Sequence, residues 1–416
     1  MAIWSSSAHD PMLTALPPDP LAILREPLAR LLAIARPIAG RGTVTAEAAM
    51  GRVLAAPLAA LHHVPPFDQS AMDGYALGPP AGAAWRITAR LAAGDADGAP
   101  LGPGEAARIF TGAPVPAGTH GVVQQEKVIR QGDGIAVPEG IPAGTNIRRA
   151  GEDLRAGVTL LEAGQRLDAR HIALAVAAGH DALPVARRLR VALASTGAEL
   201  RRAGGGLGSG QVHDSNGPML RAMLRAPDVE LVELGILPDE PGPLRDALLR
   251  AAGAADLIVT SGGVSVGEED HMAGAILAAG GTIEVVHLPI RPGKPVKAGR
   301  LGAAVILALP GNPLAAYVNL WLVGRRVLDR LAGAPARPLR PMVARAGFRE
   351  ERKPGRVEFA PVRFSGTDAL GLPVLQLLGR GSSARLAPLA AADGLCVIGP
   401  EVTRVEEGDL LGVLPF

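Results

Sequence analysis

The sequence predicts a multidomain protein of mixed α/β and β structure, built around a doubly wound, mostly parallel sheet. From residue 188 onward, short apolar runs alternate with helical patterns, which is typical of parallel strands connected through helices. These runs cover residues 191–194, 232–236, 257–259, 283–288 and 304–309. A chain of 416 residues is also too long for one ordinary core, and its other parts carry short β runs between glycines and prolines.

Shifts in composition divide the chain into five predicted parts. Residues 1–18 are rich in Pro and Ser and are expected to form a disordered tail. Residues 19–54 and 150–187 are expected to form one helical linking domain, because helical patterns occur at 21–32, more weakly at 43–54, and at 167–183. An inserted small β domain is predicted at 55–149, the α/β domain at 188–333, and a small β-barrel or sandwich at 334–416.

Composition and charge exclude several classes of function. The net charge is only +2 and there is no basic stripe, so we expect no nucleic-acid binding. No stretch approaches 18 apolar residues without charges or breakers, and no basic segment precedes an apolar run at the start. We therefore expect neither a membrane span nor a secretory signal. Cys396 is the only cysteine, which excludes an intramolecular disulfide and favours a cytoplasmic protein.

Residues 256–270, DLIVTSGGVSVGEED, are the first candidate for a ligand-binding loop. A short apolar strand runs into a glycine-rich turn, and a helical pattern follows. Glycines let a backbone approach a ligand closely and free N–H groups at a helix start attract anions, although a plain strand-to-helix connection is the alternative. Ligands bind beyond the carboxyl ends of parallel strands, so we expect the turns at Ser195, Asp239, Ser261 and Pro310 along one edge.

Carboxylates accompany these turns, at Glu199, at Asp239 and at residues 268–270. Carboxylates and an anionic ligand repel each other unless a cation lies between them, which favours a hard divalent ion, Mg²⁺ above all. The alternative for residues 268–270 is that they only complement the dipole of the helix that follows.

Positive charge gathers in residues 287–297, HLPIRPGKPVK, where Pro and Gly predict a rigid loop. Arg outnumbers Lys throughout the chain, yet this stretch contains both Lys294 and Lys297. A compact ammonium suits an oxyanion as a point charge, and a solvated basic turn is the alternative. No competing signature is present: the histidines lack paired metal-ligand spacing, and neither GxSxG nor a Walker-type loop occurs.

Four other loops concentrate polar groups. They are 65–76 (PPFDQSAMDGYA), 111–116 (TGAPVP), 146–153 (NIRRAGED) and 381–383 (GSS). Each of them, taken alone, could be an ordinary turn with no part in function.

Taken together, these segments resemble a known family. FDQSAMDGYA, TGAPVP, NIRRAGED, STGAEL, TSGGVSVGEED, PGKP and LPGNP, in this order and spacing, are similar to the motifs of the molybdopterin molybdenumtransferases, or molybdenum insertases. The E domain of gephyrin belongs to the same family. The resemblance covers about residues 20–416.

The resemblance implies a four-part, elongated homodimer with a shared active site. Its α/β domain would bind molybdopterin, and the inserted β domain of the other subunit would complete the cleft. The reaction takes adenylylated molybdopterin and molybdate to the molybdenum cofactor, releases AMP and depends on Mg²⁺. Expected protein partners are the enzyme that adenylylates molybdopterin and the apo-molybdoenzymes, both in transient contact.

Site residues carry over by motif. The functional polar residues implied in this way are Asp68, Thr111, Asp153, Glu199, Asp239 and Asp270. The residues expected to contact or shape the ligand site are Gly262, Gly263, Ser265, Pro310, Gly311, Asn312, Pro313 and Ser382. We further hypothesise that Asp239 and Asp270 hold Mg²⁺, and that Arg291 and Lys294, from the basic segment 287–297, bind molybdate or phosphate.

One position departs from the family, which usually has a lysine where this chain has His287. The charge of an imidazole changes near neutral pH, so we expect weaker molybdate use at high pH than at low pH. A flat profile between about pH 6 and 8, or an unchanged pH response in His287→Ala, would remove this idea.

Three other functions compete with molybdenum insertion. One is a non-catalytic carrier that delivers molybdopterin or finished cofactor to a dedicated apoenzyme. A second is a scaffold, which gephyrin also is, although this chain has only a short N-terminal tail. The third is the sister enzyme that adenylylates molybdopterin, against which the parts at 20–187 and 334–416 argue. Release of AMP discriminates the insertase from the carrier.

Overall fold

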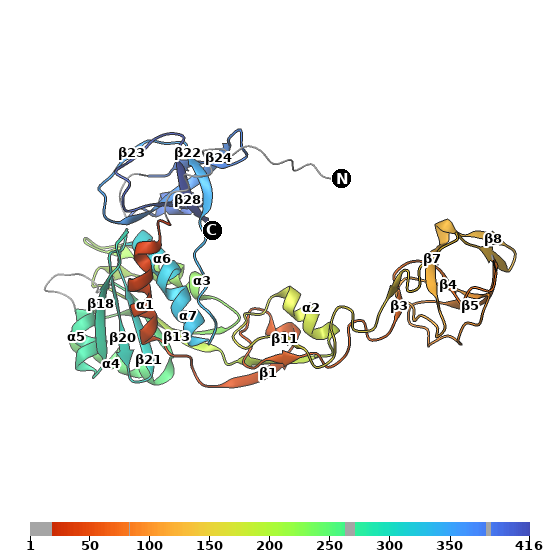
Figure 1. The fold of residues 1–416 in the computed structure, drawn as a ribbon. Helices are drawn as coiled ribbons and strands as arrows, with labels where there is room; N and C mark the ends of the chain where they lie inside the picture. The colour runs from red at the N-terminus through yellow and green to blue at the C-terminus, as the bar shows by residue number, and fades with distance from the viewer. Residues whose placement is uncertain (1–18, 83, 263–270, 380–383) are drawn as a thin grey trace. The chain divides into compact units, whose positions relative to one another are not determined.

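The computed structural model describes residues 19–82, 84–262, 271–379 and 384–416. The chain forms two compact units, one made of Gly42–Val185 and the other of Met1–Arg41 with Ala186–Phe416 (Figure 1). The predicted disordered tail, 1–18, lies outside the described residues. The predicted division into five parts is finer than these two units and stays a prediction.

A six-stranded sheet forms the centre of the larger unit. In spatial order its strands are β16 (Val229–Leu237), β13 (Leu189–Thr196), β17 (Leu257–Ser261), β21 (Ala304–Leu309), β20 (Pro295–Leu301) and β18 (Thr282–His287). The first four strands are parallel, and β20 is antiparallel to both of its neighbours. The predicted mostly parallel sheet is confirmed.

The prediction of a loop over residues 287–297 is wrong in its last part. Pro295 begins β20, and Lys297 lies within this strand with only 3% of its surface exposed. The physical reason is the long apolar hairpin that β20 forms with β21, in which Val296 and Ala298 are buried. The prolines and lysines of the segment concealed this pattern.

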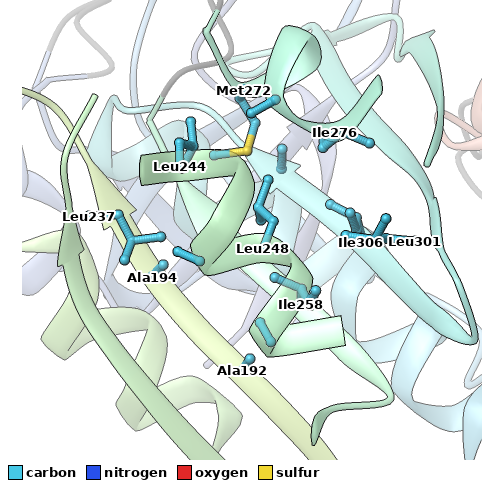
Figure 2. Packing of buried hydrophobic residues seen from close by; sticks show 14 of the residues in the cluster. Ala192, Ala194, Leu237, Leu244, Leu248, Ile258, Met272, Ile276, Leu301 and Ile306 are labelled. Carbon is cyan, nitrogen blue, oxygen red and sulfur yellow. The ribbon is translucent and has the colours of Figure 1, made fainter. Parts of the chain in front are cut away.

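Helices cover both faces of the sheet. Ala192 and Ala194 of β13 and Ile258 of β17 pack against Leu244 and Leu248 from a helix on one face (Figure 2). The helices there are α4 (Pro241–Ala254) and α5 (His271–Ala278). Side chains alternate along a strand, so the neighbouring residues of β13 point to the opposite face, and these are buried too. The helices that contact the sheet strands on that face are α1 (Arg25–Ile34), α3 (Asn216–Leu224) and α6 (Pro313–Asn319), followed by α7 (Arg325–Leu331).

The C-terminal part of the same unit is a closed five-stranded barrel, as predicted. Its strands, in order, are β24 (Val357–Thr367), β25 (Pro373–Leu377), β22 (Met342–Ala346), β28 (Leu410–Pro415) and β26 (Gly394–Ile398). Pairing between β24 and β26 closes the barrel. Val362, Leu375, Cys396 and Val413 lie fully buried in its core. The short strand β19 (Ile290–Arg291) extends the barrel sheet beside β24.

The smaller unit contains a six-stranded β sheet. Its order is β7 (Gly121–Gln124), β4 (Gly74–Leu77), β6 (Glu105–Ile109), β5 (Ala84–Leu91), β9 (Gly134–Ala136) and β8 (Ile129–Gln131). The unit also contains α2 (Ala169–Ala177) and two short ladders, which share a core around Leu54, Leu161 and Leu183. The ladders pair β1 (Arg41–Thr45) with β12 (Ala182–Ala186), and β2 (Leu58–Ala59) with β11 (Thr159–Leu161).

Of two helix predictions in this region, one is wrong and the other is confirmed only in part. Residues 43–54 form the end of β1 and a single 3₁₀ turn, Glu47–Ala49, instead of a helix. The helix expected over 167–183 covers only Ala169–Ala177. It stops before Gly179, whose φ of +101° is a left-handed conformation, and the chain then enters β12 with alternate residues buried. Within the described residues, no helix is long and apolar enough to cross a membrane.

Candidate functional site

A cavity of about 1150 Å³ opens at the carboxyl edge of the parallel strands. Thr196 at the end of β13, Ser261 at the end of β17 and Pro310 after β21 all line it, and Pro295 contributes the start of β20. Strand ends that are far apart in sequence therefore meet at one place, as expected for a sheet of this topology. The predicted site residues that line this cavity are Glu199, Asp239, Gly262, Lys294, Pro310, Gly311, Asn312 and Pro313.

Gly262 lets two strand ends approach each other in the wall of the cavity. Its φ is +96°, and a Cβ at this position would collide with the backbone oxygen of Thr196. Only glycine can adopt this positive φ without strain and also leave the space next to Thr196 free of a Cβ. Gly262, directly after β17, can therefore lie against the end of β13 in the wall of the cavity.

Asn216, which the sequence reasoning missed, joins two of the strand ends. Its Nδ2 donates to Ser261 Oγ at 2.8 Å and to the backbone oxygen of Gly311 at 2.6 Å. The side chain lines the cavity although only 7% of the residue is exposed. The signal in the sequence is weak: a polar Asp-Ser-Asn segment that runs into the start of α3 and also contributes Asp214 to the cavity wall.

The cavity wall carries acids and cations together. Glu199, Asp214 and Asp239 supply three carboxylates, and Lys294 supplies an ammonium. Asp239 Oδ1 lies 3.4 Å from Nδ1 of His271, and Asp239 Oδ1 is buried with no hydrogen-bond partner among the described residues. An anionic ligand here therefore meets both attraction and repulsion, and a bound cation would relieve the repulsion.

Two predicted cationic residues do not line this cavity. Arg291 lines a neighbouring cavity of about 250 Å³, together with Arg356 and Arg385, and its Nη1 lies 3.7 Å from Glu358 Oε2. Gly293 lines both cavities, so the two are adjacent. His287 is exposed at the end of β18 and lines neither.

In the smaller unit, three of the predicted polar loops pack against one another. Gly112 N–H donates to the backbone oxygen of Ser70 at 2.8 Å, and Val115 N–H donates to that of Asp68 at 2.9 Å. Ala71 N–H donates to the backbone oxygen of Asn146 at 2.9 Å. Loops 65–76, 111–116 and 146–153 thus form one cluster, held by backbone hydrogen bonds.

The side chains of this cluster are held in different ways. Asp68 accepts hydrogen bonds from Arg149 Nη1 at 2.6 Å and from Ala150 N–H at 2.8 Å. Burial opposes ionisation of Asp68, yet these two bonds outweigh it and lower the pKa of the carboxyl. Thr111 is bound to Asp73, a residue that the sequence reasoning did not select. Asp153 is exposed, and its N–H donates to the backbone oxygen of Val64 at 3.0 Å.

Four predicted site residues lie outside the described residues: Gly263, Ser265, Asp270 and Ser382. In the described ranges, no three His, Cys, Asp or Glu side chains gather closely enough to hold a metal ion by themselves.

Three family descriptions match the chain in order. MoeA N-terminal region (domain I and II) matches residues 23–179, "Probable molybdopterin binding domain" matches 192–330, and MoeA C-terminal region (domain IV) matches 343–416. The molybdopterin molybdenumtransferase 2 of Mycobacterium tuberculosis is 36% identical over 401 residues, which are 93% of this chain and 96% of the relative. The molybdopterin molybdenumtransferase of Haemophilus influenzae is 33% identical and covers 89% of this chain and 92% of its own.

Solved structures agree with these sequence relatives. A molybdopterin biosynthesis MoeA protein from Pyrococcus horikoshii superposes with a TM-score of 0.74 at 29% identity, over 94% of this chain and 98% of the other. A second structure of that name and organism gives a TM-score of 0.77 at 23% identity, which supports the fold. The chain belongs to the molybdopterin molybdenumtransferase (MoeA) family, enzymes that insert molybdenum in the biosynthesis of the molybdenum cofactor.

Proposed function

We propose that this enzyme takes adenylylated molybdopterin and molybdate, releases AMP and forms the molybdenum cofactor. The observation that carries the proposal is the convergence of Glu199, Asp239, Gly262, Lys294 and residues 310–313 on one cavity. Glycines in its wall let the backbone come close to a flat heterocycle, and the Lys294 ammonium attracts an anionic group. The carboxylates could hold a cation beside that anionic group.

The overall reaction has two balanced parts. A water oxygen bonds to one phosphorus of the anhydride, the bridging P–O bond breaks, and AMP leaves while the pterin keeps its phosphate. The two dithiolene thiols then bond to molybdenum, and two molybdate oxygens leave as hydroxide, so the metal is neither oxidised nor reduced. Molybdate is a substrate in this scheme.

Residues of the chain would act by binding and orienting the reactants. The Lys294 ammonium would attract phosphate or molybdate oxygens as a point charge. Arg291, in the adjacent cavity, would assist with the same oxyanion. The turns at Gly262 and Gly311 would hold the pterin, with Pro310 and Pro313 giving the wall its rigid shape. Thr111, Asp68 and Asp153 remain proposed functional residues in the smaller unit.

The donor chemistry of the cavity fits Mg²⁺. Asp239 offers a buried carboxylate oxygen without a hydrogen-bond partner among the described residues. Mg²⁺ commonly binds through one or two carboxylates together with substrate phosphates and water, so a cage of several protein ligands is not required. Asp239, with Asp270 as the second proposed ligand, would hold the ion, which would neutralise phosphate charge.

We also propose that the protein works as a cytoplasmic homodimer. The sole cysteine, Cys396, is buried in the barrel core, which suits a reducing compartment. A partner subunit would contribute residues of its inserted β domain to the site. Transient contact with the adenylylating enzyme and with apo-molybdoenzymes would bring substrate in and take product away.

Release of AMP tests the proposal. Purified protein, adenylylated molybdopterin, Mg²⁺ and molybdate should release AMP, and Asp239→Asn should reduce the rate at least tenfold, equivalent to about 1.4 kcal/mol. The matched control is Asp246→Asn, which changes an exposed carboxylate on α4 that pairs with Arg245. Tight pterin binding without AMP release would instead support the carrier function.

A further inference from the structure

Asn216 has a defined orientation in the cavity wall. Its nitrogen donates to the backbone oxygen of Gly311 at 2.6 Å, and a carbonyl oxygen can only accept a hydrogen bond. Rotating the amide by 180° would place Oδ1 of Asn216 against the backbone oxygen of Gly311, and both of these atoms are acceptors. Nδ2 must therefore face Gly311 and, with its other hydrogen, Ser261 Oγ at 2.8 Å.

This orientation determines what the hydroxyl of Ser261 can do. Because Ser261 Oγ accepts the Asn216 N–H, its own proton is directed elsewhere. No hydrogen bond donated by this hydroxyl is found in the described part of the chain. Ser261 is only 2% exposed and lines the cavity, so a ligand acceptor in the cavity would satisfy a buried donor that has no acceptor among the described residues.

We infer that Asn216 is a positioning residue that makes Ser261 a hydrogen-bond donor to the pterin substrate. The acceptor on the substrate is a phosphate oxygen or a ring carbonyl or ring nitrogen. Asn216 also joins the turn after β21 to the end of β17 through Gly311, so one buried amide fixes both the donor and the neighbouring turn. This inference rests on the proposed function, since it assigns the pterin substrate to this cavity.

Ser195 provides a matched comparison for Ser261. The two serines are register partners on the adjacent strands β13 and β17, and each is 2% exposed. Ser195 Oγ has no hydrogen-bond partner among the described residues. Ser195 lines a small cavity of only about 20 Å³ with Asp214, Arg221 and Glu233, and of these residues Asp214 also lines the large cavity. Removing its hydroxyl therefore changes a buried serine at the same depth of the sheet that does not itself line the large cavity.

The test measures molybdopterin binding by anaerobic equilibrium dialysis. Ser261→Ala should raise the Kd for molybdopterin about tenfold, as expected for losing one hydrogen bond to a charged or polar acceptor. Asn216→Asp, nearly equal in size, cannot donate as a carboxylate and should turn the Ser261 proton toward itself, which gives a similar loss. The double variant should lose no more than about threefold beyond either single variant, because both changes remove the same bond. Ser195→Ala should bind within about twofold of wild type.

Kinetics separate positioning from a general loss of structure. In AMP release, Ser261→Ala and Asn216→Asp should raise KM by the same factor and leave kcat within about threefold. If Asn216→Asp fails to fold, the Kd values of Ser261→Ala and Ser195→Ala still show whether the Ser261 hydroxyl binds the pterin. Wild-type binding by Ser261→Ala, equal losses in both serine variants, fully additive losses in the double variant, or no molybdopterin binding by wild type would each overturn the inference.

The two proposals fail in different ways. If wild type binds molybdopterin but releases no AMP, the proposed function is wrong, and dialysis still judges the role of Asn216. If wild type releases AMP while Ser261→Ala binds and turns over normally, the role of Asn216 is wrong and the proposed function stands.

Discussion

Thr111 donates two hydrogen bonds to a single carboxylate oxygen of Asp73, from its N–H at 2.8 Å and from its hydroxyl at 2.7 Å. The backbone bond lowers the pKa of the Asp73 carboxyl most, and the hydroxyl adds to it. Because the hydroxyl proton points at Asp73, the lone pairs of Thr111 Oγ1 face away from it. Thr111 Oγ1 can therefore accept a hydrogen bond from a ligand, but its proton is already used by Asp73.

Loss of Asp73 should reduce activity through Thr111. We expect Asp73→Ala to lower kcat/KM for AMP release about tenfold, because Thr111 would lose the partner that orients it. Thr111→Val should cause a similar or larger fall. The double variant should resemble Thr111→Val alone, since Asp73 would act only through the threonine.

Asp133→Ala is the control for this experiment, because Asp133 is exposed in the turn between β8 and β9 of the same sheet. It should keep wild-type rates. Full activity in Asp73→Ala, or a further large fall when it is added to Thr111→Val, would contradict the link between the two residues. Full activity in Thr111→Val would instead remove Thr111 from the proposed site.

A partly buried ion pair between Asp256 and Arg187 should make the larger unit sensitive to acid. Burial opposes ionisation of Asp256, yet hydrogen bonds from Arg187 Nη1 and Nη2 at 2.8 and 2.7 Å, and from Arg190 N–H, lower the pKa of its carboxyl overall. A carboxyl whose pKa is lower in the folded than in the unfolded state stabilises the fold above its unfolded pKa. This contribution is lost as the pH falls below about 4.

Asp256→Asn should therefore lower the free energy of unfolding by about 2 kcal/mol at pH 7, since Arg187 is partly exposed and a fully buried pair would lose more. Urea denaturation measures this difference, which should shrink as the pH approaches 3. Asp246→Asn, at an exposed pair, should change stability by less than about 0.5 kcal/mol. A difference that grows toward low pH would contradict the assignment.

Gly262 should not tolerate a side chain. Gly262→Ala combines a left-handed conformation with a collision against the Thr196 backbone, so we expect a loss of about 2 kcal/mol or more in unfolding free energy. Molybdopterin binding should weaken at the same time. Gly253→Ala in α4, where nothing lies within 4 Å of the added Cβ, should instead stabilise the protein by about 0.5–1 kcal/mol. Equal effects of the two changes would show that Gly262 is not tightly packed against Thr196.

The reactivity of the Cys396 thiol should measure how easily the C-terminal barrel opens. Its thiol is fully buried beside Val362 and Val413, and burial raises its pKa. We expect no reaction with a thiol reagent in the folded protein, and labelling that follows unfolding in urea. Rapid labelling under native conditions would mean that the barrel opens far more easily than its closed strand pairing suggests.

Local sequence patterns were enough to predict the parallel strands, but they could not predict which side chains meet in the cavity. Residues 257–259 were recognisable because a strand buried on both faces is continuously apolar. Strand β20 was missed because Lys297, Pro295 and the preceding glycine are typical of a loop, and only its pairing with β21 makes it a strand. Residues 43–54 were misread because residues 43–45 belong to β1, whose partner strand β12 lies far along the chain.

Asn216 could not be selected from the sequence for a similar reason. Its amide contacts Ser261 and Gly311, which lie 45 and 95 positions further along the chain. Nothing in the local segment indicates which strand ends will surround it. Asp73 was passed over because its partner, Thr111, lies 38 positions away.

The most direct test of the account is to quantify AMP and molybdenum cofactor together in one anaerobic reaction of the wild-type protein with adenylylated molybdopterin, Mg²⁺ and molybdate. We predict equal amounts of the two products, with cofactor formed only when molybdate is present. Molybdopterin that stays bound and adenylylated, with neither product formed, would contradict the claim that this cavity is the site of molybdenum insertion.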